Sequence, residues 1–364
     1  MIVTEVRLTD FLSYTAEAVR FSGGLNVVTG ANASGKTNLI DSIYYAAIGR
    51  SSRHSKDKDL IRWGAETGAM VTVKVQKRFS THTVDIYVDP QGKKRVLVDG
   101  IPISRIGELM GVVSVVFFSP EEIKLVKESP ADRRRFLDIS LSQQSKTYFY
   151  TLSKYNKLLQ QRNKILKSYK GRPNLKDMLK IVDGEMIRAG AYLIAERAKF
   201  LESLDPLAAE EHLKLTGGKE ALKLTYETET VDFGDIKESL AKLTEQAFHN
   251  DERLEYTTIG PHRDDIKISA SGVDLRRFGS QGQQRSAVLS LKLAEIRAFY
   301  NRTGETPVLL LDDVLSELDA DRQSALFDAV GGMQTFVTCT EFHDRFSDRF
   351  ALYEIVDRKV LKRI

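Results

Sequence analysis

The sequence predicts an α/β protein in which the two ends of the chain complete one domain and a helical lobe is inserted between them. Three patterns predict this class. Residues 30–37 read G-x-x-x-x-G-K-T, residues from 256 onward alternate apolar strands with helices as parallel sheets do, and residues 119–213 favour helix with few breaks. We expect the first domain at residues 1–121 and 257–364, and the mainly helical second domain at residues 122–256.

The N-terminal part should hold two kinds of sheet. A first strand and a turn fall within residues 1–21, and the apolar run 25–29 predicts a strand before a helix at 37–48. Residues 49–62 are polar and basic, which predicts an exposed loop entering a short helix. Between residues 69 and 99 valines alternate with polar residues, and this period of two predicts an antiparallel sheet with one solvated face.

The middle and C-terminal parts of the chain follow in order. The apolar run 112–118 predicts a buried strand, and Ser119-Pro120-Glu121-Glu122 opens a series of three or four helices that Gly171-Arg172-Pro173 interrupts. The remaining expected elements are a strand at 222–226, a helix at 233–248, a strand around 266–268, a helix at 286–300, a strand at 308–311, a helix at 321–330 and a strand at 335–339.

The glycine-rich segment is the phosphate-binding loop motif of NTPases. Its glycines allow close backbone approach, and successive N–H groups at a helix start attract phosphate oxygens. We expect Lys36 to reach the β- and γ-phosphates and the Thr37 hydroxyl to bind Mg²⁺. The expected nucleotide-binding residues are Gly30, Ala31, Asn32, Ala33, Ser34, Gly35, Lys36, Thr37 and Asn38.

Two acids end the apolar strand at 308–311, and such a strand beside a phosphate loop normally holds the metal. We expect Asp312 to contact Mg²⁺ and Asp313 to polarise the attacking water, so the catalytic set is Lys36, Asp312 and Asp313. The segment Gly279–Arg285 opens a long helix, with Ser280 as a good N-cap residue and Gly282 allowing close approach of a ligand.

Composition and charge limit the class of protein. No apolar run reaches the roughly 18 residues of a membrane span, the N-terminus lacks a signal-peptide pattern, and the single Cys339 excludes an internal disulfide, so we expect a cytoplasmic protein. Residues 124–180 hold 15 Lys and Arg and 4 Asp and Glu, a net charge of +11 in a chain whose total is +4. This asymmetry indicates a polyanionic partner.

The motifs together resemble the ABC-type ATPase head, which implies a mixed, mainly parallel core sheet beside an antiparallel one, with ATP and Mg²⁺ as ligands. In that family two heads dimerise face to face, and the signature motif of one caps the γ-phosphate held by the other. The positions matching the signature motif are Ser280, Gln281, Gly282 and Gln283, and those matching the D-loop are Ser316 and Asp319. The sequence departs from the usual family pattern at S-Q-G-Q-Q and at Asp313, where many relatives have Glu; the shorter carboxylate suggests slow hydrolysis.

Within that superfamily the chain is similar to the RecF family of bacterial recombinational repair proteins. The residues that carry this similarity are Pro120-Glu121, Ser129–Asp138, Gly260–Asp265, Leu310–Asp319, Arg322 and Leu326. The resemblance implies ATP-dependent homodimerisation on double-stranded DNA near single-strand gaps, cooperation with RecR and RecO in loading RecA, and a weak, DNA-stimulated ATPase that acts as a switch. The sequence shows no glutamine that matches the Q-loop of that family. His343 is either the switch histidine or a surface histidine.

Basic residues in three segments are the candidate DNA contacts. They lack a base-reading module, which predicts backbone contacts with little sequence preference and binding that weakens with salt. The three adjacent arginines fan across about 200° of a helix and cannot all face one ligand. The candidates are Arg50, Arg53, Lys56, Arg133, Arg134, Arg135, Lys154, Lys157 and Lys164.

Two other functions share part of this pattern. The ATPase subunit of a membrane transporter has the same ATP motifs, but it does not explain the arginines at 133–135 or the +11 segment. A small-molecule kinase with a phosphate loop does not explain the signature-like Ser280–Gln284. We therefore expect a DNA-binding protein that engages no membrane.

Overall fold

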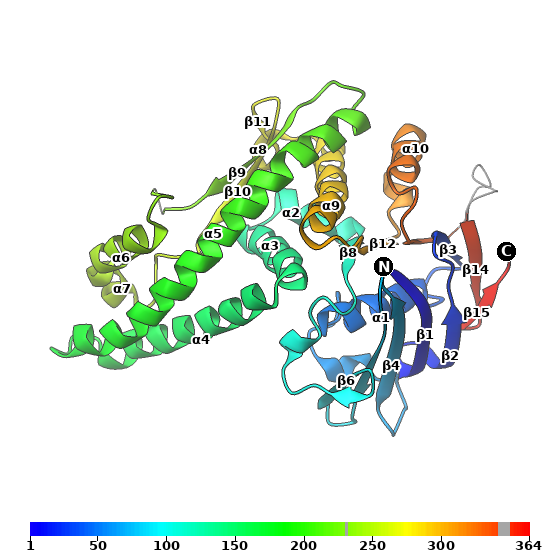
Figure 1. Cartoon of the computed structure of the whole chain (residues 1–364), viewed down its shortest axis with the longest axis horizontal. Helices are drawn as coiled ribbons and strands as arrows, with labels where there is room; N and C mark the ends of the chain where they lie inside the picture. The colour runs from blue at the N-terminus through cyan, green and yellow to red at the C-terminus, as the bar shows by residue number, and fades with distance from the viewer. Residues whose placement is uncertain (230–231, 341–349) are drawn as a thin grey trace. The chain divides into compact units, whose positions relative to one another are not determined.

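A computed structural model describes residues 1–229, 232–340 and 350–364, which form two compact units. The head unit comprises Met1–Glu122 and Leu289–Ile364, and the helical unit comprises Ile123–Val288 (Figure 1). Residues 257–288, which we expected in the head, group with the helical unit, because strand β10 (Asp265–Ala270) pairs with β9 (Leu222–Glu227) along its whole length.

A six-stranded sheet forms the core of the head unit, in the order β15-β14-β3-β13-β12-β8. All neighbouring strands run parallel except the edge pair β14 and β15. The bounds are β3 Leu25–Thr29, β8 Val115–Phe118, β12 Val308–Asp312, β13 Thr335–Cys339, β14 Phe350–Val356 and β15 Lys359–Lys362. Every residue of β12 and β13 is buried, as expected for central parallel strands covered on both faces.

The second sheet of the head unit is antiparallel, in the order β2-β1-β4-β5-β6-β7. Its bounds are β1 Ile2–Phe11, β2 Tyr14–Arg20, β4 Ala69–Gln76, β5 Thr81–Val88, β6 Lys94–Val98 and β7 Ile101–Pro102. The alternating valines of β4 and β5 are buried and the residues between them are more exposed. The predicted alternation is therefore confirmed.

Helices complete the head unit. Helix α1 (Lys36–Ile48) follows β3 through the glycine-rich loop and ends at Gly49, whose positive φ of 72° closes the helix in the left-handed conformation. The short helical segments are η1 (Asp57–Leu60), η2 (Ile106–Glu108), η3 (Pro120–Ile123, at the boundary of the units) and η4 (Leu315–Glu317), and α10 (Ala320–Ala329) connects η4 to β13.

The helical unit is built around the long helix α5 (Leu175–Leu215), which contacts α3, α4, α6 and β9 (Figure 1). Gly190 permits this packing, because a Cβ there would lie 3.0 Å from Leu240 and 3.3 Å from Tyr155 and Pro261. The other elements are α2 (Lys124–Lys127), α3 (Pro130–Gln144), α4 (Lys146–Tyr169), α6 (Ile236–Gln246), α7 (Phe248–Leu254), the three-stranded sheet β11-β10-β9 with β11 (Val273–Asp274), and α8 (Leu275–Phe278).

Helix α9 (Gln281–Thr303) begins in the helical unit and continues into the head unit. No helix among the described residues is long and apolar enough to span a bilayer. The expected elements are present, with the interruption at Gly171-Arg172-Pro173 separating α4 from α5, whereas β14 and β15 were not predicted.

Candidate nucleotide site and nucleic-acid surfaces

The phosphate loop joins β3 to α1 and depends on two glycines in the left-handed region. Gly30 has a φ of +149°, and a Cβ there would lie 2.8 Å from the carbonyl oxygen of Ile355. Gly35 has a φ of +120°, and a Cβ there would lie 2.9 Å from the hydroxyl oxygens of both Ser13 and Tyr14. Neighbouring atoms already occupy the space that a Cβ would need at either position, so the loop conformation requires glycine at both.

Two polar side chains of the loop, Lys36 and Ser34, are suited to bind an anion. The Lys36 side chain is largely buried, and its Nζ donates to the carbonyl oxygens of Gly30 at 2.6 Å and Ala31 at 2.9 Å. The Ser34 hydroxyl is buried without a hydrogen-bond partner. An ammonium held over the loop and an unsatisfied hydroxyl beside it fit the oxygens of a bound phosphate.

The predicted metal-binding residues meet at the carboxyl end of the core sheet. Asp312, the last residue of β12, accepts hydrogen bonds at Oδ1 from Thr37 Oγ1 at 2.9 Å and from Thr338 Oγ1 at 2.7 Å. Burial raises the pKa of Asp312, and the two hydroxyl donors and the charge of Arg53 oppose that rise. A buried carboxylate next to a threonine hydroxyl provides the hard oxygen ligands that Mg²⁺ prefers.

Few protein ligands surround this position. Within residues 1–229, 232–340 and 350–364 no group of three or more His, Cys, Asp or Glu could hold a metal. Mg²⁺ commonly keeps several waters and takes the rest of its ligands from substrate phosphates and one or two carboxylates. The Thr37–Asp312 pair fits that mode of binding, in which the protein supplies only part of the ligand set.

Asp313 follows the strand in a different environment. Its φ is +54°, its side chain is exposed, and its backbone N–H donates to Thr338 Oγ1 at 2.9 Å. The left-handed conformation is one that aspartate tolerates better than most residues. The exposed Asp313 carboxylate therefore takes no part in the side-chain hydrogen bonds that hold Asp312, and its action on a water molecule stays a prediction.

Ser13 and Tyr14, which lie outside the glycine-rich motif, support the phosphate loop. The Tyr14 hydroxyl donates to the carbonyl oxygen of Gly35 at 3.0 Å, and Asn38 Nδ2 donates to Ser13 Oγ at 2.9 Å. Both contacts link α1 to the turn between β1 and β2, which lies more than 20 residues earlier in the chain. No local pattern marks them, because each role depends on a tertiary contact.

The signature-like segment lies in the helical unit and starts α9. Ser280 is exposed, its hydroxyl accepts from the backbone N–H of Gln283 at 3.2 Å, and its own N–H donates to Gln283 Oε1 at 2.9 Å. This reciprocal capping box leaves Gln281 exposed and Gly282 partly exposed, and Gln283 also binds Glu220. The N-cap prediction for Ser280 is confirmed.

The D-loop residues also stabilise local structure. Ser316 Oγ donates to the carbonyl oxygen of Asp313 at 2.9 Å. Asp319 caps α10 by accepting from the backbone N–H of Arg322 at 2.9 Å. Both side chains are exposed and belong to the turn that begins at Asp313.

The basic loop 49–62 is held close to the nucleotide site. Asp41, buried in α1, accepts from Ser51 Oγ at 2.6 Å and from the backbone N–H of Ser52 at 2.7 Å. Arg50, Arg53 and Lys56 are exposed on this loop. Their exposure keeps them available to a polyanion.

The three adjacent arginines of α3 differ in burial, as the angle between consecutive helix residues requires. Arg133 is buried, donates to both carboxylate oxygens of Asp265 at 2.5 and 2.8 Å, and donates to the carbonyl oxygens of Leu125 and Glu128. The prediction that Arg133 contacts DNA is therefore wrong, because its guanidinium holds α3 to β10. Arg134 is half-buried and donates to the carbonyl oxygen of Asp264, whereas Arg135 is exposed.

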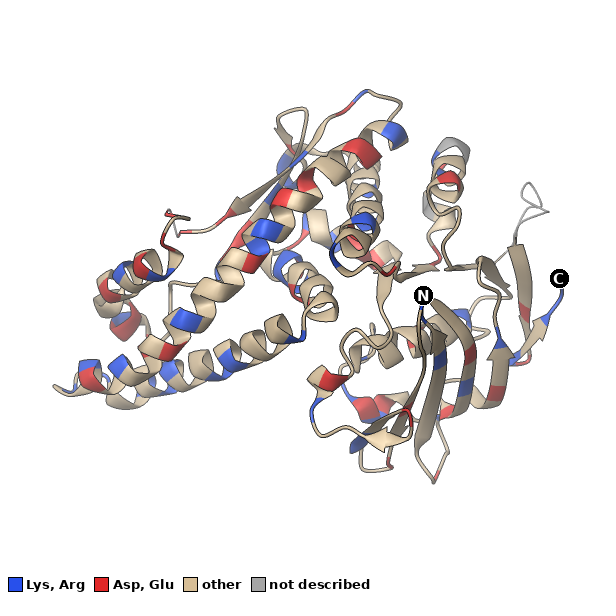
Figure 2. Ribbon diagram, in the orientation of Figure 1, with Lys and Arg blue, Asp and Glu red and all other residues tan. Residues whose placement is uncertain are grey.

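Lysine and arginine residues recur along α4 (Figure 2). Lys157 and Lys164 are exposed, and Lys154 is exposed but forms an ion pair with Glu185 of α5. On the opposite side of the same helix, Arg162 is fully buried between Asp183 and Asp251, at 2.6 Å from each. Part of the +11 charge therefore stabilises the interior of the helical unit.

Comparison with known proteins places the chain in a family. Residues 2–349 match the family model described as the RecF/RecN/SMC N terminal domain. The chain is 40% identical over 363 residues to the DNA replication and repair protein RecF of Clostridium novyi, covering 99% of each, and 42% identical over 344 residues to that of Clostridium tetani, covering 93% of each. The chain belongs to the RecF family.

Solved structures agree with this assignment. The recombination mediator protein RecF of the RecFOR pathway, in its ATP-bound structure, superposes with a TM-score of 0.92 at 34% identity, covering 100% of this chain and 98% of the other. The Smc head domain of Pyrococcus furiosus gives a TM-score of 0.58 at 17% identity, which shows the shared fold alone. The fold is that of an ABC-type ATPase head with a helical insertion.

The RecF-type segment Gly260–Asp265 organises the helical unit. Gly260 has a φ of +128°, and a Cβ there would lie 2.5 Å from the Tyr155 hydroxyl. His262 Nδ1 lies 2.7 Å from that hydroxyl and Nε2 lies 3.1 Å from the carbonyl oxygen of Thr257, so Nε2 carries the proton. Burial lowers the pKa of His262 to about 4. His262 is therefore a neutral structural residue.

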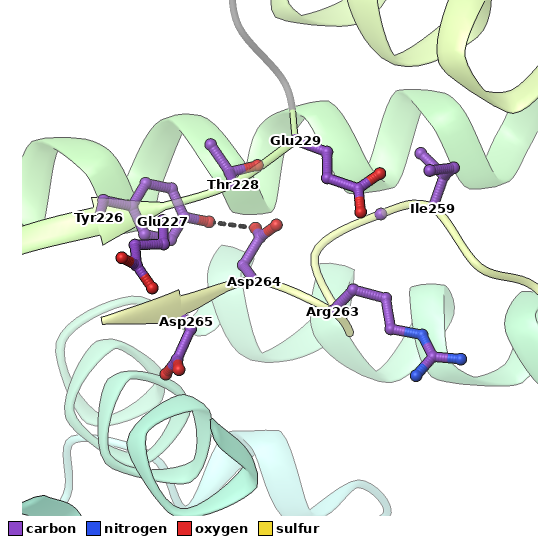
Figure 3. A pocket seen from close by; sticks show the side chains of 9 residues that line it. Tyr226, Glu227, Thr228, Glu229, Ile259, Arg263, Asp264 and Asp265 are labelled. Carbon is purple, nitrogen blue, oxygen red and sulfur yellow. Dashed lines mark hydrogen bonds between the residues drawn. The ribbon is translucent and has the colours of Figure 1, made fainter. Parts of the chain in front are cut away.

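A recess of about 450 Å³ lies beside this segment (Figure 3). Figure 3 shows Arg263 extending along one side and Asp264 joined to the Tyr226 hydroxyl by a hydrogen bond. Four of the nine lining residues are carboxylates: Glu227, Glu229, Asp264 and Asp265. Carboxylates outnumber the one cationic side chain of the lining, Arg263, which disfavours the binding of phosphate groups there.

Proposed function

We propose that this RecF-family chain is an ATP-dependent DNA-binding protein of recombinational repair. ATP drives two copies to dimerise on duplex DNA near a single-strand gap, where the dimer acts with RecR and RecO to load RecA. Weak, DNA-stimulated hydrolysis then resets the dimer in the cytoplasm. The observation that carries the proposal is the pairing of Thr37 with Asp312 beneath a left-handed glycine loop, which is a nucleotide cradle.

Different residues of the head unit bind the phosphates, bind the metal and activate the water. The amides of residues 30–38 and the Lys36 ammonium hold phosphate oxygens, and the Lys36 contacts with Gly30 and Ala31 are exchanged for them. Thr37 and Asp312 would hold Mg²⁺, which would neutralise charge on the phosphates. Asp313 orients and polarises the attacking water, and its exposed position on the turn makes that role available.

The second half of the site comes from another copy. Ser280 and Gly282 lie at the start of α9 with the Ser280 side chain exposed, and a helix N-terminus favours an anion. We assign these residues, with Gln281 and Gln283, to the γ-phosphate held by the partner copy, and Ser316 and Asp319 to the same interface. ATP is then the ligand that joins the two copies.

DNA is held through its phosphates. Arg50, Arg53 and Lys56 project from the head unit, and the exposed residues Arg135, Lys157 and Lys164 project from the helical unit. Arg134 and Lys154 retain internal contacts and would contribute less. Cations without a base-reading module bind any sequence with affinity that falls steeply as salt rises.

Sedimentation velocity with a gapped duplex tests the proposal. Wild-type protein with ATP should sediment as a dimer on the DNA at low salt, and without ATP as a monomer. Lys36→Ala should remain monomeric with ATP, whereas Lys176→Ala, at an exposed lysine of the helical unit, should behave as wild type. An equal dimer fraction with and without ATP contradicts ATP-driven dimerisation. DNA binding that salt does not weaken points to the transporter-type alternative.

A further inference from the structure

Trp63 is the most exposed large apolar side chain among the described residues, with 97% of its surface accessible. It is also the only tryptophan in the sequence. Tryptophan is on average among the more buried residues, so a fully solvated indole is unusual. It lies in the loop between η1 and β4, in the head unit.

The backbone just before this indole is held by hydrogen bonds to Asp10 and Leu12. The Leu12 N–H donates to the carbonyl oxygen of Leu60 at 2.8 Å, and the Arg62 N–H donates to the carbonyl oxygen of Asp10 at 2.7 Å. The Arg62 side chain forms an ion pair with Asp10 at 2.7 Å and also donates to the carbonyl oxygen of Trp63 at 3.2 Å. The exposed ring therefore projects from an anchored backbone, which lowers the entropic cost of binding a ligand.

Positive charge accumulates in the same loop. Residues 49–63 contain five Lys and Arg and two Asp. Of the two acids, Asp57 is neutralised by Lys94 at 2.9 Å and accepts from the Tyr45 hydroxyl at 3.0 Å. Lys56 and Lys58 are exposed just before the indole.

We propose that Trp63 is a stacking site for an unpaired DNA base, with the neighbouring cations holding the flanking phosphates. An aromatic face beside a basic surface is the arrangement that binds single strands without regard to sequence. The inference rests on the proposed function, and it adds a means of distinguishing a gap from intact duplex. The paired bases of a duplex are stacked on one another and offer no face to the indole, whereas a base in a gap does.

Intrinsic fluorescence tests this directly, because emission from tryptophan reports on Trp63 alone. Protein with ATP at low salt is titrated with a duplex carrying a thymidine gap of about ten nucleotides, a length within the usual range of single-strand sites. The same duplex with the gap filled is the comparison. The gapped duplex should quench the emission, and the filled duplex should bind with little quenching.

Variants measured by anisotropy of labelled DNA complete the test. Trp63→Ala should weaken binding to the gapped duplex about tenfold and leave binding to the filled duplex unchanged, since one stacked base is lost. Trp63→Phe should retain most of the affinity. Phe79→Ala is the matched control, because Phe79 is also exposed but follows β4 at the opposite end from Trp63, and it should behave as wild type.

Three results would overturn the assignment. Equal quenching by both duplexes, or wild-type binding of the gapped duplex by Trp63→Ala, removes the unpaired base as the ligand. Quenching by ATP without DNA places the indole against the nucleotide base. A wild-type protein that fails to bind even the filled duplex contradicts the proposed function itself, which is a separate outcome.

Discussion

Asp312 and Asp313 are adjacent residues whose environments differ because a strand ends between them. Asp312 is buried and accepts two threonine hydroxyl hydrogen bonds, whereas Asp313 is exposed in the left-handed conformation. The first position suits a metal ligand and the second a group that acts on water. We therefore propose metal binding for Asp312 and activation of water for Asp313.

Replacing Asp313 with Asn should separate these two roles. Asparagine is isosteric and tolerates the same positive φ, so the turn should persist. Asp313→Asn should bind ATP as wild type but hydrolyse it at least about tenfold more slowly, since a positioned base typically contributes 10²–10⁴-fold. The dimer should then accumulate with ATP. Phosphate release measures hydrolysis, and sedimentation measures the dimer. Asp313→Glu, which keeps a carboxylate, is the control. Undiminished hydrolysis by Asp313→Asn would contradict a catalytic role for Asp313.

His262 predicts a pH dependence of stability. Its pKa is lowered to about 4 in the fold, against an ordinary value near 6.5, so protons bind the unfolded chain more strongly. The stability from the neutral ring is present above about pH 6.5 and is lost as pH falls toward 4, by about 2–3 kcal/mol. Urea unfolding at pH 7.5 and pH 4.5 measures this. His262→Gln should show a smaller loss between the two pH values, and an identical loss contradicts the assignment.

Helix α3 shows how one element assigns three neighbouring arginines to different roles. Consecutive residues are about 100° apart on a helix, so Arg133 points into the unit while Arg135 points to solvent. The identical side chains give no indication of this division in the sequence. The partner Asp265 lies 132 residues away and becomes visible only with the fold.

Two substitutions in α3 should therefore have opposite effects. Arg133→Met should destabilise the protein by about 3 kcal/mol, because it leaves Asp265 without its cation. Arg135→Ala should leave stability unchanged and reduce the slope of log affinity for DNA against log salt by about 1. Chemical unfolding and salt-dependent anisotropy measure these quantities. Equal loss of stability in both variants would contradict the division of roles.

Elements that carry a local signal could be predicted from sequence. The phosphate loop, its strand and helix, the alternating valines of β4 and β5 and the N-cap Ser280 each depend on residues close together in the chain. Strands β14 and β15 were missed. Strand β14 pairs with β3 across more than 300 residues of sequence, β15 pairs only with β14, and charged residues interrupt the apolar pattern of both strands.

Residues of the candidate nucleotide site were also predictable only where a local motif marks them. Asp312 and Thr37 could be named from motifs, whereas Thr338, Tyr14 and Asp41 could not, because their hydrogen bonds join segments without a recognisable spacing. His343 lies outside the described residues, and the DNA-contact assignments for the remaining basic residues stay predictions.

At the scale of the whole molecule, the predicted nucleotide-binding residues 30–38 lie in the head unit and Ser280 lies in the helical unit. Our central claim is that the cap of each copy serves the cradle of another. ATP binding and dimerisation should therefore be separable by a change at Ser280 alone. A change at Lys36 should remove both together.

The most direct test is sedimentation velocity of Ser280→Asp with and without ATP, with nucleotide binding measured in parallel. Aspartate preserves the N-cap of α9 but places a negative charge against the partner's terminal phosphate. We predict ATP binding equal to wild type and no ATP-dependent dimer, while Ser280→Thr, which keeps the hydroxyl, still dimerises. A Ser280→Asp protein that dimerises with ATP as wild type would contradict the account.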